Sequence, residues 1–243
     1  MKTLSERYDV VLDRIHHTAV RANRNPAEIT LVAVTKTLPA EIVQAAYEVG
    51  MRHFGENRAA ELVEKRPLLT SHTKPDDPII WHAIGTIQSR KTNAIANHAD
   101  IFHALDRLKI ANRLSHRLVE NGRNLPIFLE INISGEASKA GFNCAHWEQD
   151  ATQTAHLRTV AQKVAQLPSL QLAGLMTMAP WHVEPEQIRT IFRRTRQLAQ
   201  QLQNDLALTS PLQLSMGMTD DFEIAIEEGA THIRVGRAIF GER

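Results

Sequence analysis

The sequence predicts an α/β protein built as a single (β/α)8 TIM barrel. Its 243 residues fit one such barrel, which typically takes about 250. From residue 29 onward, short apolar runs alternate with longer amphipathic stretches, which is the pattern of βαβ units on a parallel sheet. The first apolar run ends in TKTLP. A doubly wound sheet, the alternative architecture, typically has a glycine-rich turn there, so the barrel is favoured.

The expected elements follow in order along the chain. An amphipathic helix is predicted over 1–20, where Leu4, Tyr8, Val11, Leu12 and Ile15 recur at helical spacing. Eight strands are predicted at 29–35, 52–55, 79–84, 101–104, 127–133, 170–176, 212–215 and 232–235. Helices are predicted between them at 39–49, 57–65, 91–98, 107–121, 152–167, 184–206 and 220–228. No linker interrupts the alternation, so we expect one domain over 1–243 with an N-terminal helix.

Composition argues against several classes of partner. Lys and Arg number 28 against 27 Asp and Glu, so no net positive field attracts nucleic acid or an anionic membrane. The sequence has no run of about 18 apolar residues and no secretory signal. Cys144 is the only cysteine, and no HExxH or Cys/His cluster occurs. We therefore expect a cytoplasmic protein without a metal site.

Lys36 ends the first predicted strand, and in barrels of this kind functional side chains gather at the carboxyl ends of strands. Pro39, just beyond it, suits the first turn of the next helix. A lysine at an apolar barrel mouth tends to lose its proton more easily, because desolvation disfavours the ammonium, and a neutral amine attacks aldehydes. Lys36 is thus a candidate for forming a Schiff base. The alternative is an ordinary surface lysine at a strand end.

Two segments near the C-terminus suggest a phosphate site. LSMGMTD at 214–220 and IRVGRAIFG at 233–241 lie at the ends of the seventh and eighth strands. Barrels often bind phosphate there, through loop amides and the start of a short extra helix. Gly217 and Gly236 let the backbone approach a phosphate, Ser215 can donate its hydroxyl, and residues 236–240 can begin the helix. Ordinary turns are the alternative for each segment alone, but the two together favour phosphate binding.

Arg234 lies inside the eighth predicted strand, where a permanent cation is costly without a hydrogen-bond acceptor. One hypothesis gives it the ring nitrogen of a cofactor held by Lys36. A protonated arginine would donate to an unprotonated ring nitrogen and so weaken the cofactor as an electron sink. The alternative is an ion pair with Glu130, Glu227 or Glu228.

Asn57 and two histidines are weaker candidates. Asn57 follows the second strand, where it can be a helix N-cap or a ligand for the phenolic oxygen of the cofactor. His82 and His103 are candidates for the barrel mouth, although structural roles are favoured for both.

Several segments resemble the pyridoxal phosphate homeostasis proteins, and the likeness runs from the first strand to the C-terminus. They are VTKTLP at 34–39, FGEN at 54–57, WHAIGTIQ at 81–88, GLM at 174–176, LSMGM at 214–218 and RVG at 234–236. The resemblance implies a barrel similar to the N-terminal domain of alanine racemase, which is fold type III among pyridoxal phosphate (PLP) proteins. It also implies that PLP is bound covalently to Lys36, with Arg234 facing the pyridine nitrogen and the phosphate held around Ser215, Gly236 and Arg237.

This chain departs from the family pattern at a few positions. Family members often have threonine where Arg237 stands, and many have serine in place of Thr35 and Ala104. These changes put single contacts in doubt. At residue 237 the backbone amide remains, and the guanidinium can substitute for the hydroxyl.

The leading functional prediction is a non-catalytic PLP carrier that buffers the cofactor or delivers it to PLP-dependent apoenzymes, acting as a monomer. A PLP-dependent racemase or lyase is the first alternative. Alanine racemases, which resemble this barrel, take a tyrosine proton donor from an additional domain, whereas Tyr8 and Tyr47 here fall in predicted helices. The second alternative is a lysine aldolase for a sugar phosphate, with no cofactor.

Overall fold

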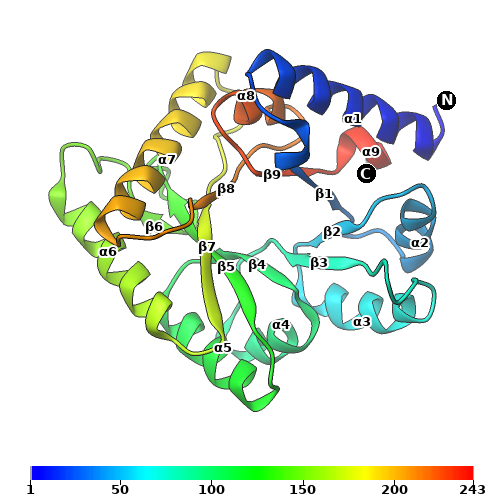
Figure 1. Cartoon of the computed structure of the whole chain (residues 1–243), viewed down its shortest axis with the longest axis horizontal. Coiled ribbons are helices and arrows are strands. Elements are labelled where there is room, and N and C mark those ends of the chain that lie inside the picture. The colour runs from blue at the N-terminus through cyan, green and yellow to red at the C-terminus, as the bar shows by residue number, and fades with distance from the viewer. Residues whose placement is uncertain (1, 243) are drawn as a thin grey trace.

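A computed structural model describes residues 2–242, which form a closed parallel barrel (Figure 1). Neighbouring strands follow the order β4-β3-β2-β1-β9-β8-β7-β5, and a β4–β5 pairing closes the ring. The barrel strands are β1 (Thr30–Val34), β2 (His53–Glu56), β3 (Ile80–Ala83), β4 (Ile101–Leu105), β5 (Leu125–Asn132), β7 (Leu170–Met176), β8 (Gln213–Ser215) and β9 (His232–Val235). The predicted fold class is therefore confirmed.

Helices surround the strands and complete the βα alternation (Figure 1). They are α2 (Ala40–Glu48), α3 (Ala59–Thr70), α4 (Thr92–His98), α5 (Leu108–Glu120), α6 (Ala151–Gln166), α7 (Pro185–Asp205), α8 (Phe222–Glu227) and the short α9 (Arg237–Phe240). Two 3-10 helices, η1 (Pro26–Glu28) and η2 (Ser89–Lys91), lie before β1 and α4. A two-residue strand that was not predicted, β6 (Phe142–Asn143), pairs with the end of β5 outside the ring.

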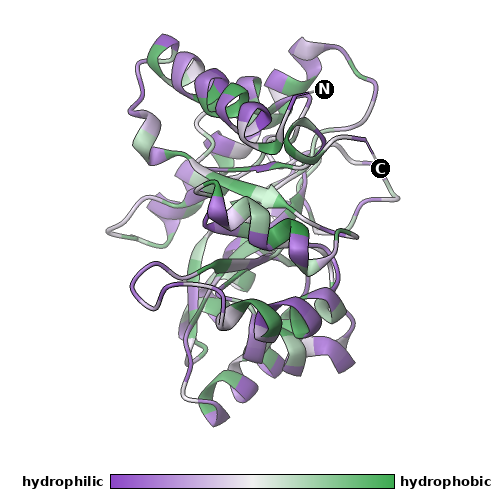
Figure 2. Cartoon of the chain, turned by 90° about the vertical axis from the view of Figure 1, so that its right-hand side faces the viewer, coloured by the Kyte–Doolittle hydropathy of each residue, from purple (hydrophilic) through white to green (hydrophobic). Residues whose placement is uncertain are grey.

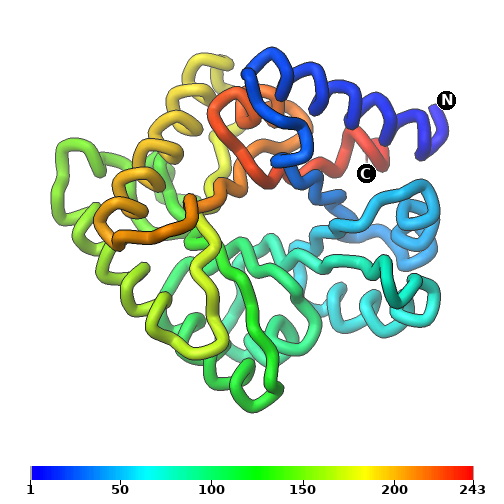
Figure 3. Tube along the Cα trace, viewed as in Figure 1, coloured from blue at the N-terminus to red at the C-terminus, as the bar shows by residue number. Residues whose placement is uncertain are grey.

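The N-terminal helix α1 (Leu4–Arg21) starts with a capping box, in which Thr3 and Glu6 satisfy each other's backbone amides. It buries Val11 and Ile15 and contacts α8 and α9, so the two ends of the chain lie side by side (Figure 3). Leu12, which was predicted to share the apolar face, is 39% exposed.

The core lies inside the ring and between the ring and its helices. The strands are mostly apolar, whereas the helices alternate apolar and polar faces (Figure 2). This pattern is expected where parallel strands are covered on both sides. The largest fully buried side chains include Phe54, Phe102, Phe128, Phe192 and Phe222. None of the described helices combines the length and apolar character that crossing a membrane requires.

Candidate functional site

A pocket of about 200 Å³ lies at the carboxyl ends of the strands and gathers most of the predicted site residues. We call it the Lys36 pocket. It is lined by Lys36, Asn57, Arg234, Gly236 and Arg237, together with Val34, Ile84, Met178, Trp181, Met218 and Thr219. Residues far apart in the sequence therefore meet where the barrel geometry predicts a site.

Lys36 lies two residues after the end of β1, and its side chain is exposed at the pocket. The enclosure expected for this amine is therefore not found. Its neighbour Thr37 has a left-handed backbone, with φ of 65°, which is a costly conformation for a β-branched residue. The Thr37 amide donates to Glu61 Oε2 at 2.6 Å, and this bond helps to hold the turn.

A buried ion-pair cluster anchors the chain on both sides of Lys36. The Nζ atom of Lys65 donates to the Thr35 carbonyl at 2.9 Å, to Glu56 Oε1 at 2.8 Å and to Glu61 Oε2 at 3.0 Å. An ammonium has three donors, so Lys65 is fully engaged. The Thr35 hydroxyl also donates to Glu56 Oε1, at 2.7 Å. Lys36 is thus the lysine that the pocket presents, and Lys65 holds the backbone beneath it.

Arg234 is buried in β9 and forms part of the pocket lining. Its Nη1 donates to Ser215 Oγ at 2.6 Å and its Nη2 to the Thr177 carbonyl at 3.0 Å. Burial lowers the pKa of Arg234 to about 10, although the charges of Asp221 and Glu130 oppose this shift.

The alternative expectation for Arg234, an ion pair with Glu130, Glu227 or Glu228, is not found among the described residues. Instead, Glu227 and Glu228 pair with arginines such as Arg21 and Arg189. Two neutral acceptors use only part of the five N–H groups of the guanidinium, so an electron-rich group in the pocket would complete its hydrogen bonding.

Gly236 and Arg237 form the start of α9, where Gly236 is the N-cap and no side chain caps the free amides. The Arg237 guanidinium pairs with Asp220 and lies 5.8 Å from the ring centroid of Trp181. Trp181 is 62% exposed and stands at the same pocket. Uncapped amides next to a cation suit a small anion.

Ser215 and Gly217 lie behind this lining. The Ser215 hydroxyl is fully buried and already bonded to Arg234 and His103. Gly217 has φ of 96°, and an added Cβ would lie 2.6 Å from the Cβ of Ala225 in α8. Its carbonyl accepts from the Arg234 amide at 2.9 Å. Direct phosphate contacts from these two residues remain predictions.

Asn57 lines the pocket and is not a helix cap, because α3 has Arg58 at its N-cap position. His82 and His103 are buried and bonded to each other at 2.8 Å, and neither lines the pocket. This agrees with the structural roles that were favoured for both.

Met178 and Trp181 were not predicted as lining residues from the sequence. Their position after the seventh predicted strand could have indicated them, since loops on that side share one face.

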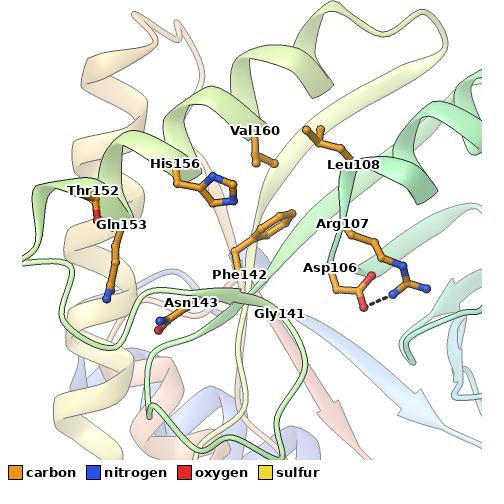
Figure 4. A pocket seen from close by; sticks show the side chains of 10 residues that line it. All are labelled: Asp106, Arg107, Leu108, Gly141, Phe142, Asn143, Thr152, Gln153, His156 and Val160. Carbon is orange, nitrogen blue, oxygen red and sulfur yellow. Dashed lines mark hydrogen bonds and ion pairs between the residues drawn. The ribbon is translucent and has the colours of Figure 1, made fainter.

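A larger cavity, of about 540 Å³, lies away from the Lys36 pocket, between the start of α5 and the start of α6 (Figure 4). Phe142 and His156 lie together on one side of it, and Asp106 and Arg107 form an ion pair on the other. It contains none of the predicted site residues. Among residues 2–242, no group of three or more His, Cys, Asp or Glu side chains is arranged to hold a metal.

The chain is similar to known proteins along its whole length. A family model for the N-terminal domain of alanine racemase matches residues 10–243. The pyridoxal phosphate homeostasis protein of Pseudomonas aeruginosa is 43% identical over 243 residues, covering 100% of this chain and 97% of the relative. The protein of that name from Escherichia coli strain K12 is 39% identical over 245 residues, with 100% and 98% covered.

Solved structures agree with the sequence matches. The structure of PipY from Synechococcus elongatus with PLP bound has a TM-score of 0.80 and 33% identity, covering 98% of this chain and 100% of that chain. An alanine racemase from Clostridium difficile has a TM-score of 0.69 at 13% identity, covering 96% of this chain and 56% of that chain. The racemase likeness is one of fold alone.

Proposed function

The chain belongs to the family of the pyridoxal phosphate homeostasis proteins, and on that premise we propose that it holds pyridoxal 5'-phosphate in the Lys36 pocket. PipY, which is 33% identical to this chain and matches 98% of it, was solved with PLP bound. The single observation that carries the proposal is the lining of this pocket, which combines an exposed amine, a buried guanidinium with spare donors, and the uncapped start of α9. An aldehyde, a pyridine nitrogen and a phosphate are the groups that such a set accommodates.

Lys36 is the residue proposed to bind PLP covalently. Its Nζ would form a C=N bond with the aldehyde carbon, and the carbonyl oxygen would leave as water. Lys65 is not a competitor, because its amine is buried and already donates to three oxygen atoms. The cluster around Lys65 would hold Lys36 in place during this reaction.

The remaining predicted residues would hold the rest of the molecule. Arg234 would donate to the pyridine nitrogen, and Asn57 lies where it could reach the phenolic oxygen. The amides of Gly236 and Arg237 would bind the phosphate, helped by the Arg237 guanidinium. Ser215 and Gly217 would act indirectly: the Ser215 hydroxyl accepts from the Arg234 guanidinium, and the Gly217 carbonyl accepts from the Arg234 amide.

We propose a carrier function, in which a single-domain monomer in the cytoplasm buffers PLP or passes it to PLP-dependent apoenzymes. The lining supports this over racemisation. Its ionisable side chains are those of Lys36, Arg234 and Arg237, so Lys36 is the one suited to act as a base. Tyr8 lies in α1 and Tyr47 in α2, where the Tyr47 hydroxyl donates to the Asp77 carbonyl at 2.8 Å.

Borohydride reduction of the protein mixed with PLP tests the proposal. We expect a yellow imine that is bleached by borohydride, and a pyridoxyl group on the peptide that contains Lys36, identified by mass spectrometry. Lys36→Ala should give no adduct, whereas Lys91→Ala, which removes an exposed lysine outside the pocket, should react as the parent does.

An adduct at another lysine would contradict the assignment of Lys36. A folded protein that forms no adduct would favour the cofactor-free aldolase. Racemisation of L- or D-alanine that is lost in Lys36→Ala would replace the carrier function with catalysis.

A further inference from the structure

A line of hydrogen bonds runs through the barrel interior and ends on Arg234. His53 Nδ1 lies 3.0 Å from His82 Nε2, and His82 Nδ1 lies 2.8 Å from His103 Nε2. His103 Nδ1 then lies 2.8 Å from Ser215 Oγ, which accepts from Arg234 Nη1. We call this line the histidine relay. It starts at His53, the half-buried first residue of β2, and reaches the guanidinium that lines the Lys36 pocket.

The direction of the relay follows from the chemistry of Ser215. Arginine can only donate, so Arg234 occupies one lone pair of the Ser215 oxygen. The hydroxyl hydrogen then needs an acceptor, and among the described residues the remaining partner of this oxygen is His103 Nδ1. With the opposite direction, this buried hydroxyl hydrogen would have no acceptor, which is unfavourable.

The donor and acceptor atoms of each imidazole fix those of the next imidazole in the relay. Because His103 accepts at Nδ1, a neutral ring carries its proton on Nε2 and donates to His82. His82 likewise accepts at Nδ1 and donates from Nε2 to His53. The ring of His103 is held in position by stacking on Phe128, with centroids 4.5 Å apart.

The surroundings keep these rings neutral. Burial lowers the pKa of His82 and His103 well below the ordinary value, and the neighbouring His232 and, for His103, Arg234 act in the same direction. A second proton on His82 would place two N–H groups face to face. A second proton on His103 would point at the hydroxyl hydrogen of Ser215. His232 bonds to the Thr231 hydroxyl and is not a member of the relay.

We infer that Ser215 and His103 are positioning residues for Arg234, and that with His82 and His53 they form a relay of fixed direction in which each neutral imidazole carries its proton on Nε2. The relay holds the guanidinium so that its other donors are presented to the pocket. This use of the relay rests on the proposed function, whereas its direction does not.

Nitrogen-15 NMR of the ligand-free protein tests the direction. Protonated and bare imidazole nitrogens have different chemical shifts, and replacing each histidine in turn by Gln assigns the signals. We expect His53, His82 and His103 all to be protonated at Nε2. A proton on Nδ1 of His103 would overturn the inference, whether or not the protein binds PLP.

Ser215→Ala tests the positioning role. Without the hydroxyl the direction is no longer fixed, so the signals of His103, His82 and the more distant His53 should all change. PLP affinity should fall about tenfold, as expected for one hydrogen bond to a charged group. Thr195→Val, the matched control, removes a buried hydroxyl in α7 that donates to the Ile191 carbonyl, and it should leave the relay signals and the PLP affinity unchanged.

Changes confined to His103, or PLP affinity within about twofold of the parent, would show that Ser215 merely fills space. If Ser215→Ala does not fold, Ser215→Cys replaces the hydroxyl with a weaker donor and should shift signals and affinity in the same direction. A parent protein that binds no PLP would refute the proposed function, and the ligand-free NMR would still decide the direction of the relay.

Discussion

Glu130 on β5 is a buried carboxyl group, and no described residue bonds to its Oε2 atom. Burial, together with the nearby charge of Asp106, raises the pKa of Glu130 to about 7, although Arg234 opposes the shift. In the unfolded chain the same group titrates near 4.5. Between these values the folded protein binds the proton and the unfolded chain does not, so this carboxyl group lowers the free energy of unfolding as the pH rises from 4.5 to 7.

We therefore expect Glu130→Gln to flatten the pH dependence of stability. At pH 8 the variant should be about 2 to 3 kcal/mol more stable than the parent, and at pH 4 the two should be nearly equal. Urea denaturation at a series of pH values measures this. A stability difference that does not change between pH 4 and pH 8 would contradict the assigned titration.

At the residue level, the sequence was most informative where position in the barrel decides function. Lys36, Arg234 and Gly236 could be placed because strand ends converge on one face. Ser215 was harder, because a buried hydroxyl can donate to a ligand or to a neighbouring side chain, and only the three-dimensional arrangement shows that His103 and Arg234 surround it. The relay could not be predicted at all, because its histidines lie on separate strands.

Among the elements, α3 is tied to the end of β2 by a buried ion pair. The side chains of Lys65 and Glu56 are 4% and 0% exposed. Burial raises the pKa of Glu56 to about 7, opposed by Lys65 and by the Thr35 hydroxyl. Removing one partner of such a pair leaves the other without compensation.

Lys65→Met should therefore destabilise the protein by about 3 kcal/mol at pH 8, where Glu56 is ionised. The double variant Lys65→Met/Glu56→Gln should recover more than half of that loss, because residue 56 then carries no charge. Thermal and urea denaturation of the two variants and the parent measure both effects. A double variant as unstable as Lys65→Met would show that packing, rather than charge, is responsible.

Predicted strands and helices agree with the structure to within a few residues, and the largest difference is at α3. Its predicted end was residue 65, whereas the helix continues to Thr70 through Pro67. Proline removes one helical N–H, but the last turn buries Leu69, which offsets the loss. The strand β6 is two residues long, too short to give a periodic pattern.

At the scale of the whole molecule, ring closure requires close contact between β7 and β8. A Cβ added at Gly174 would lie 1.9 Å from the backbone oxygen of Gln213, which cannot move without separating the strands. Gly174→Ala should cost about 3 kcal/mol or more. In the control Gly122→Ala, φ is 62° and the space is open, so the cost should be only about 1 to 2 kcal/mol.

Equilibrium unfolding of the two glycine variants provides the comparison. Similar losses at both positions would mean that the barrel tolerates a wider gap between these strands.

The fold itself was predictable from the sequence, since a regular alternation of strands and helices in a chain of this length leaves few architectures. The packing at Gly174 was not, because it depends on the distance between two backbones.

The pairing of β1 with β9 places Lys36 beside the segment that contains Arg234 and Arg237. During translation, Lys36 leaves the ribosome long before these arginines are synthesised. A nascent chain thus exposes its lysine without the surrounding pocket. Under the proposed function, PLP can therefore be bound specifically only after β9 has been made and has joined the ring. If the proposal is right, ribosome-bound intermediates should be unable to retain PLP, and only the finished polypeptide should do so.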